Sequence, residues 1–207
     1  MSVTRRLPRY YRCLGDLADK GVERISSREF AKIIGFTASQ IRQDLNCFGG
    51  FGQQGYGYNV AVLQREIGRI LAVDRNFPAI LIGAGNLGLA LLNHLRFEQR
   101  GFELLGIFDN NPEIVGKTVR DWSILDIDRL EDFCSTNHPI AAILCVPDSA
   151  AQEIADRLVA LGVKAFWNFT HLNLSLIYDK EDIAVENVHL GDSLMTLTYL
   201  VSELTEK

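Results

Sequence analysis

The sequence lacks several features that would place it in a specialised class of protein. None of its 207 residues belongs to an apolar run long enough to cross a lipid bilayer, and its basic start is followed by no hydrophobic core of a signal peptide. Its four cysteines form no C-x-x-C pair, and three have the apolar surroundings of reduced core thiols. We therefore expect a cytoplasmic globular protein with no metal site, no membrane segment and no catalytic cysteine.

Excess positive charge is confined to the N-terminal part of the chain. Residues 1–76 hold 12 Lys and Arg against 7 Asp and Glu, although the whole chain carries a formal net charge of −5. A small basic region attached to an acidic remainder favours contact between the basic part and a polyanion. Two unrelated solvated surfaces would give the same balance, so charge alone leaves both interpretations open.

A glycine-rich stretch follows the apolar strand predicted at residues 79–82. Gly83 suits a tight turn, Gly85 lets the backbone approach a pyrophosphate, and Gly88 lets the next helix pack closely on its strand. The same loop includes Ala84, and the first helical amides, those of Asn86 and Leu87, can face phosphate oxygens. A G-x-G-x-x-G spacing alone also fits a structural turn, but a strand before it and a helix after it predict dinucleotide binding.

An acidic residue ends the next predicted strand. Asp109 follows residues 102–108 and lies 21 positions after Gly88, about where the ribose-binding acid of a dinucleotide site falls. A carboxylate there accepts hydrogen bonds from the ribose hydroxyls and repels a 2′-phosphate. We therefore expect NAD(H) to be preferred over NADP(H).

Apolar strands alternate with helices through the rest of this region. After a helix at 86–95, the pattern predicts strands at 102–108, 141–146, 164–168 and 183–185, with helices at 127–134 and 148–161. Such alternation predicts an α/β fold built on a doubly wound, mostly parallel sheet. Ligands bind these sheets at the carboxyl ends of the strands, which brings toward the nicotinamide end Val146, Pro147, Asn168 and Phe169.

The N-terminal region is predicted to contain short helices joined by a glycine turn. Residues 5–20 form the first helix. Ser26 and Glu29 have capping-box spacing before the second helix, and Thr37 and Gln40 repeat that spacing before the third. The second and third helices make a helix-turn-helix unit.

The third helix carries side chains suited to DNA. Ile41 and Leu45 are placed to face the core, which leaves outside the polar residues Ser39, Gln40, Arg42 and Gln43. Gln and Arg read base edges through paired hydrogen bonds, and Ser at a helix start suits phosphate contact. A small three-helix bundle with a polar face is the alternative at this point.

Three further segments complete the predicted organisation. Glycine alternates with aromatic and amide residues over 48–58, which predicts a β-hairpin wing, and Asn59 then caps a helix that ends near residues 74–76. A last helix at about 191–204 has a coiled-coil-like seam of Leu190, Leu194, Leu197, Val201 and Leu204. We therefore predict domains at 1–76, 77–188 and 189–207.

Nearly from end to end, the chain resembles the Rex family of redox-sensing transcriptional repressors. The resemblance is carried by residues 7–12 (LPRYYR), 41–45 (IRQDL), 51–60 (FGQQGYGYNV), 83–88 (GAGNLG), 108–109 (FD), 146–147 (VP) and 167–170 (WNFT). It implies a homodimer with an N-terminal winged helix-turn-helix, a Rossmann-type NAD(H)-binding domain and a C-terminal helix swapped between subunits. It also implies a repressor that binds palindromic operators with NAD⁺ or without cofactor and releases them with NADH.

With the resemblance, each candidate residue receives an expected role. On the cofactor side, residues 83–88 hold the pyrophosphate and Asp109 the adenosine ribose. On the DNA side, the third helix enters the major groove. Further DNA contacts are expected from Tyr56 and Tyr58 in the wing and, to phosphates, from Arg5, Arg6 and Arg9.

At two positions the sequence departs from the family pattern. His94 stands where a family tyrosine lies near the nicotinamide, and His189 stands where a family aspartate pairs with the arginine matched by Arg12. Asp192, one turn further on, could replace that aspartate, or a histidine contact could make the switch sensitive to pH. Both histidines could equally be ordinary surface or packing residues.

A nicotinamide-dependent dehydrogenase with a basic appendage is the alternative from another class of protein. It would need a substrate domain and a general acid or base against the nicotinamide ring. Only a short tail follows the predicted sheet, so we expect no enzyme. A dimerising NAD-binding scaffold would leave the Gln- and Arg-bearing helix unexplained.

Overall fold

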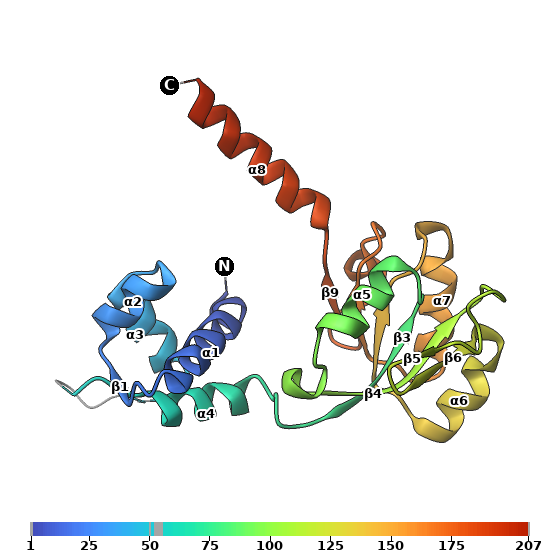
Figure 1. Ribbon diagram of the computed structural model, residues 1–207, viewed down its shortest axis with the longest axis horizontal. Coiled ribbons are helices and arrows are strands. Elements are labelled where there is room, and N and C mark those ends of the chain that lie inside the picture. Colours follow the sequence, from blue (N-terminus) through green and yellow to red (C-terminus); the bar gives the residue numbers. More distant parts are fainter. Residues whose placement is uncertain (1, 50, 52–55, 207) are drawn as a thin grey trace. The chain divides into compact units, whose positions relative to one another are not determined.

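A computed structural model describes residues 2–49, 51 and 56–206, and the chain divides into two compact units, Met1–Arg75 and Asn76–Lys207 (Figure 1). Each unit has its own hydrophobic core. We call them the N-terminal unit and the C-terminal unit and describe each by itself.

Among its described residues, the N-terminal unit contains four helices and a two-stranded sheet (Figure 1). The helices are α1 (Val3–Asp19), α2 (Ser27–Ile34), α3 (Ala38–Asn46) and α4 (Val60–Ile70), and β1 (Arg24–Ile25) pairs antiparallel with β2 (Tyr58–Asn59). Three of the helices begin at capping side chains, because Ser26, Thr37 and Asn59 each accept a hydrogen bond from a backbone amide of the first turn. The Ser26–Glu29 capping box is confirmed in both directions.

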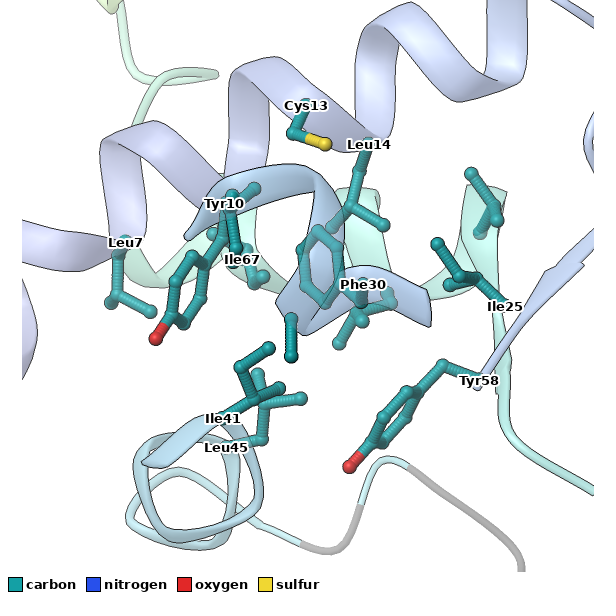
Figure 2. Close-up of a cluster of buried hydrophobic side chains, with 14 residues drawn as sticks. Leu7, Tyr10, Cys13, Leu14, Ile25, Phe30, Ile41, Leu45, Tyr58 and Ile67 are labelled. Carbon is teal, nitrogen blue, oxygen red and sulfur yellow. The ribbon is translucent and has the colours of Figure 1, made fainter. Parts of the chain in front are cut away.

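Side chains from α1, α2, α3 and α4 meet in one apolar core (Figure 2). Ile41 and Leu45 are buried as predicted, so α3 packs on this core and its opposite face is exposed. Tyr58 also lies in this core and is 8% exposed. Part of the predicted wing, at residues 50 and 52–55, lies outside the described residues; the described strand that follows it pairs with β1.

Two local predictions in this unit need correction. The Thr37–Gln40 capping box is only half formed, because the Gln40 side chain donates to Asp44 instead. Helix α4 ends at Ile70 rather than near residues 74–76. The chain there adopts a positive φ at Ala72, and the amide of Val73 closes the helix on the carbonyl of residue 68.

The C-terminal unit contains a seven-stranded sheet in the order β5-β6-β4-β3-β7-β8-β9. The strands are β3 (Phe77–Ile82), β4 (Phe102–Asp109), β5 (Thr118–Val119), β6 (Trp122–Asp126), β7 (Ala141–Leu144), β8 (Ala165–Asn168) and β9 (Ala184–Asn187). All pairs are parallel except β5 with β6. The six parallel strands have the Rossmann order, with the reversal between β3 and β7, so a doubly wound parallel sheet is confirmed.

Helices cover both faces of this sheet (Figure 1). Helix α5 (Asn86–His94) packs on one face, whereas α6 (Leu130–Asn137) and α7 (Asp148–Ala160) pack on the other. Short 3₁₀ turns lie at η1 (Glu98–Arg100), η2 (Ile127–Arg129) and η3 (Leu174–Leu176). Strands β5 and β6 were not predicted, because the sequence around Trp122 shows no clear period.

A terminal helix, α8 (Leu190–Thr205), follows the last strand. All its residues are described, and none of them is buried in the single chain. The exposed fraction of the apolar side chains in its predicted seam ranges from 49% at Val201 to 74% at Leu204. In the described part of the chain, no helix is long and apolar enough to cross a membrane, and no group of His, Cys, Asp and Glu side chains is placed to bind a metal.

Candidate functional site

The turn between β3 and α5 has the geometry of a phosphate-binding loop. Gly83 has φ +96°, and a Cβ there would overlap the carbonyl oxygen of Cys145. A Cβ on Gly88 would overlap the carbonyl oxygen of Gly83, so glycine is required for the helix to pack on the turn. By contrast, a Cβ on Gly85 meets no described heavy atom within 4 Å. The three glycines therefore fit the turn, approach and packing roles expected of them.

Asp109 anchors this loop from the end of β4. Its Oδ2 accepts a hydrogen bond from the amide of Ala84 at 2.7 Å, and its Oδ1 accepts one from the amide of Asn111 at 2.8 Å. An ionised carboxylate has about four acceptor positions, so two remain for other donors. Asp109 thus supports the glycine turn and can still accept ribose hydroxyls.

A cavity of about 620 Å³ opens beside the loop, at the carboxyl ends of β3, β4 and β7. This volume suits a small-molecule or cofactor site. Five predicted cofactor residues line it, namely Gly83, Gly85, Asp109, Val146 and Pro147. Further residues that were not predicted also line the cavity: Ile82, Asn110, Asn111, Ile114, Ile127, Cys145, Ala150, Glu153, Ile154 and Arg157. Many of them follow strand ends or begin α7, so the strand-end rule used for Pro147 could have found them.

Two titratable side chains of the cavity wall are chemically quiet. The guanidinium of Arg157 donates to both carboxylate oxygens of Glu131, at 2.9 and 3.1 Å, and this pairing lowers the pKa of Glu131. Burial raises the pKa of the Cys145 thiol to about 12, so the thiol stays protonated at neutral pH. The Cys145 thiol therefore provides no nucleophile at this wall.

Seven predicted cofactor residues are not among the described residues that line the cavity. Four of them, Ala84, Asn86, Leu87 and Gly88, belong to the glycine turn and the first turn of α5, and the other three are Asn168, Phe169 and His94. Asn168 is buried, and its side chain binds Thr170, the carbonyl of residue 172 and the side chain of residue 187. Phe169 packs edge-on against Trp167, with ring centroids 4.6 Å apart. His94 is exposed at the end of α5, which starts at the cavity and runs about 12 Å away from it.

The histidine at the start of α8 has a neighbour that the sequence did not predict. His189 is the N-cap residue of α8, and its ring stacks 6.5 Å from that of His171. Asp148 accepts a hydrogen bond from the backbone amide of His171 at 2.8 Å. Asp192 lies exposed in the first turn of α8, and Arg12 is exposed on α1 in the other unit. The proposed switch among these residues stays a prediction.

Helix α3 presents an exposed polar face in the N-terminal unit. Ser39, Arg42 and Gln43 are exposed, and Arg42 donates to the hydroxyl of Ser27 at 3.1 Å. Tyr56 is 71% exposed beside the guanidinium of Arg24, which donates to its carbonyl oxygen.

Tyr58 was predicted to contact DNA from the wing, but its side chain is buried. Gly57 has φ +71°, and a Cβ there would lie 2.6 Å from the carbonyl oxygen of Ile25. The chain thus turns tightly onto β1, and Tyr58 faces the core rather than solvent. Tyr56, one residue before the turn, keeps the exposed position expected of a DNA contact.

The predicted phosphate-binding arginines of α1 have different surroundings. Arg5 is exposed, and Arg9 is exposed with its guanidinium 5.3 Å from the ring centroid of Phe36. Arg6 forms a bidentate ion pair with Asp44, in which Nε donates to Oδ2 at 2.6 Å and Nη2 donates to Oδ1 at 2.7 Å. This pair was not predicted, because a carboxylate within a polar-faced helix gives no sequence signal of burial.

The carboxylate of Asp44 is 2% exposed and fully engaged. The hydroxyl of Tyr10 donates to Oδ2 at 2.6 Å, and the amide of Gln40 donates to Oδ1 at 2.8 Å. The bonds from Arg6 hold the pKa of Asp44 below its usual value despite burial. Burial and the bond to Asp44 raise the pKa of Tyr10.

Fold and site together define a class: a protein with a Rossmann-type nucleotide-binding unit and an N-terminal helix-turn-helix unit of the DNA-binding kind. Family models agree with this description. Residues 1–46 match the family described as "Putative DNA-binding protein N-terminus", and residues 74–172 match the family described as "CoA binding domain".

Curated relatives and solved structures identify the family. The chain is 54% identical to the redox-sensing transcriptional repressor Rex of Clostridioides difficile (strain 630), over 98% of this chain and 95% of the relative. It is 52% identical to Rex of Caldanaerobacter subterraneus subsp. tengcongensis, over 98% and 89%. The chain belongs to the Rex family of redox-sensing transcriptional repressors. This membership confirms the resemblance and sets aside the dehydrogenase alternative.

Structures of a Rex-family repressor called RSP have the same fold. RSP in complex with β-NAD⁺ and operator DNA is 51% identical, with a TM-score of 0.90 over 99% of this chain and 94% of that chain. RSP in complex with β-NADH is 48% identical, with a TM-score of 0.89 over 99% and 95%.

Proposed function

We propose that this protein is a cytoplasmic homodimer that represses transcription and responds to the NADH/NAD⁺ ratio. It binds a palindromic operator with NAD⁺ or without cofactor, and operator affinity falls when the cavity holds NADH. The observation that carries the proposal is the pairing, in one chain, of an exposed Gln- and Arg-bearing helix with a dinucleotide-type cavity. Related RSP, bound to β-NAD⁺ and operator DNA, supports it.

The C-terminal unit fits NAD(H). The open space at Gly85 and the start of α5 would hold the pyrophosphate, because free helical amides and the helix dipole favour anions there. Asp109 would accept the ribose hydroxyls and disfavour the 2′-phosphate of NADP(H). The bound nicotinamide supplies the redox state that is sensed. We keep Asn86, Leu87, Val146 and Pro147 as cofactor contacts of the chain, with Asn168 as a support beneath them.

The N-terminal unit fits duplex DNA. Helix α3 would enter the major groove with its N-terminal residues against base edges, as second helices of helix-turn-helix units do. Arg42 and Gln43 are exposed on that helix, and Ser39 is exposed in its first turn. Contacts to the phosphate backbone of the DNA would come from Arg5, Arg9 and Tyr56.

Helix α8 would bury its seam against a second copy of the chain. A 16-residue helix with this many exposed apolar side chains is costly in water unless a partner covers it. We propose domains at 1–76, 77–188 and 189–207, with the last swapped between subunits. Phe169 and His94 stay proposed contacts toward the nicotinamide. A chain without residues 190–207 is expected to sediment at the monomer mass, and a dimer without them would refute this part.

The cofactor can act on the operator only through a difference in affinity between two dimer arrangements. A coupling of about 1–3 kcal/mol changes DNA affinity by about 5- to 150-fold. Such a coupling needs only that NADH and NAD⁺ favour different arrangements.

Selection of binding sites from random DNA duplexes at one stated salt concentration tests the proposal. We expect a palindrome with half-sites a whole number of helical turns apart, enriched with NAD⁺ and lost with NADH. Selection that neither cofactor alters would refute the sensor and leave the DNA-binding unit. Tight cofactor binding without any selection would refute the repressor.

A further inference from the structure

The buried carboxylate of Asp44 lies in the second half of α3, four residues after Gln40. It joins that helix to α1, because its partners Arg6 and Tyr10 belong to α1 whereas Gln40 belongs to α3 itself. The two oxygens divide these partners. Tyr10 donates to Oδ2, Gln40 donates to Oδ1, and Arg6 donates to both.

The hydrogen bond to Asp44 selects one orientation of the Gln40 amide. An ionised carboxylate only accepts hydrogen bonds, so it must face Nε2 of Gln40 and not Oε1. The amide nitrogen has two hydrogens, and the bond to Oδ1 uses one of them. The carbonyl oxygen and the second N–H are left on the side away from Asp44.

That remaining pair of groups is the one that reads adenine. Gln recognises adenine by accepting from N6 and donating to N7. Gln40 is the third residue of α3, half-buried at the end of the helix whose N-terminal residues contact bases in helix-turn-helix proteins. Arg6 neutralises the carboxylate, so a buried negative charge near DNA phosphates carries little penalty.

We propose that Asp44 is a positioning residue that pre-orients the Gln40 amide to read one adenine of the operator half-site. The inference rests on the proposed DNA-binding function. Asp44 itself touches no DNA; it acts by removing the alternative orientation of Gln40, in which the NH₂ group would face the base and favour acceptor-only edges.

The test measures discrimination rather than affinity alone. Operator duplexes selected with the full-length protein are altered one adenine at a time to guanine, symmetrically in both half-sites, and affinities are measured by fluorescence anisotropy at fixed salt. Gln40→Ala is expected to abolish discrimination at one position, a loss of about tenfold or more. Asp44→Asn is expected to lose it at the same position, and the double variant to lose no more than either.

Tyr10→Phe is the matched control. It removes one hydrogen bond from Oδ2 but leaves the bond between Oδ1 and Gln40, while the buried ring stays in the core. We expect Tyr10→Phe to keep the adenine discrimination of the unaltered protein, whatever its effect on stability. If Asp44 had only a structural role, Asp44→Asn and Tyr10→Phe would each lower the affinity for every duplex by the same factor.

Side-chain ¹⁵N relaxation tests the proposal in the unaltered protein, should Asp44→Asn fail to fold. The Gln40 amide is expected to be rigid in the absence of DNA and the exposed Gln43 amide mobile. Equal mobility of the two amides, or full discrimination retained by Asp44→Asn, would overturn the inference while cofactor-dependent operator binding stands. Failure of the unaltered protein to select any duplex would overturn the proposed function as well.

Discussion

Alanine substitutions at two glycines of the turn between β3 and α5 are expected to affect different properties, one cofactor binding and the other stability. Gly85 has φ −72° and ψ −168°, which alanine adopts without strain, and its added methyl group would enter open space. Gly88 lies within α5, and a methyl group there would overlap the backbone oxygen of Gly83. We therefore expect Gly85→Ala to fold normally and lose NADH binding, and Gly88→Ala to lose stability.

The magnitudes follow from what each methyl group meets. At residue 85 the free energy of unfolding should change by no more than about 0.5 kcal/mol, because nothing in the protein is displaced. The methyl group would hold the pyrophosphate away from the helix amides, and each lost hydrogen bond to a charged group is worth about 1.5–3 kcal/mol. NADH affinity should therefore fall at least about tenfold. At residue 88 the backbone must move, at a cost of about 1–3 kcal/mol or more.

Both variants are assayed by urea denaturation and by titration of NADH fluorescence. Normal NADH affinity in Gly85→Ala would show that the pyrophosphate does not approach this turn. A Gly85→Ala protein as unstable as Gly88→Ala would refute the assignment of open space to residue 85. Normal stability in Gly88→Ala would contradict the close contact between α5 and the turn.

Three further predictions address the cofactor site, the N-terminal core and pH. Asp109→Asn replaces one acceptor by a donor at the ribose position, so NADH affinity should fall at least about tenfold in a fluorescence titration, and an unchanged affinity would contradict the ribose assignment. Phe30→Ala empties a fully buried site packed against Tyr10, so unfolding of the N-terminal unit should become about 3–5 kcal/mol easier by urea denaturation, whereas a change below about 1 kcal/mol would contradict its burial. Hydrogen bonds from Arg6 lower the pKa of Asp44 in the folded protein. The ionised carboxylate therefore stabilises the folded state fully above the ordinary carboxyl pKa of about 3.9, and this stabilisation is lost as pH falls through the lower pKa of the folded state. Stability should therefore fall more steeply below about pH 4 in the unaltered protein than in Asp44→Asn, and parallel pH profiles from denaturant titrations would refute this.

Much of the fold followed from local patterns. The caps at Ser26 and Asn59 and the glycine spacing at residues 83–88 are short-range signals, because each acts within one turn of backbone. Residues 79–82 of β3 and 141–144 of β7 are continuous buried apolar runs, as strands covered on both faces are, and β4 and β8 are mostly apolar. Their alternation with helices then restricts the topology to a doubly wound parallel sheet.

The candidate site followed only in part. The phosphate loop, Asp109 and Pro147 could be predicted because strand ends of such sheets meet at one edge. The same rule could also have indicated Asn110 and Cys145, but not Ile114 and Arg157, which reach the cavity from a loop and from a helix face whose directions depend on packing. Asn168 ends β8 as predicted, but its side-chain amide donates to the carbonyl of Leu172 and to the side chain of Asn187, and no sequence motif indicates these partners.

The sequence by itself determined most of the helices and the central buried strands, the capping residues Ser26 and Asn59, and the glycine turn at residues 83–88. Tertiary structure alone decided that Tyr58 faces inward, that a two-residue strand forms at β1, and that Asp44 binds Arg6. Periodicity and capping depend on neighbours within a few residues, so they are written locally in the chain. Strand partners and buried ion pairs join residues far apart in sequence, and only the packed fold brings those residues together.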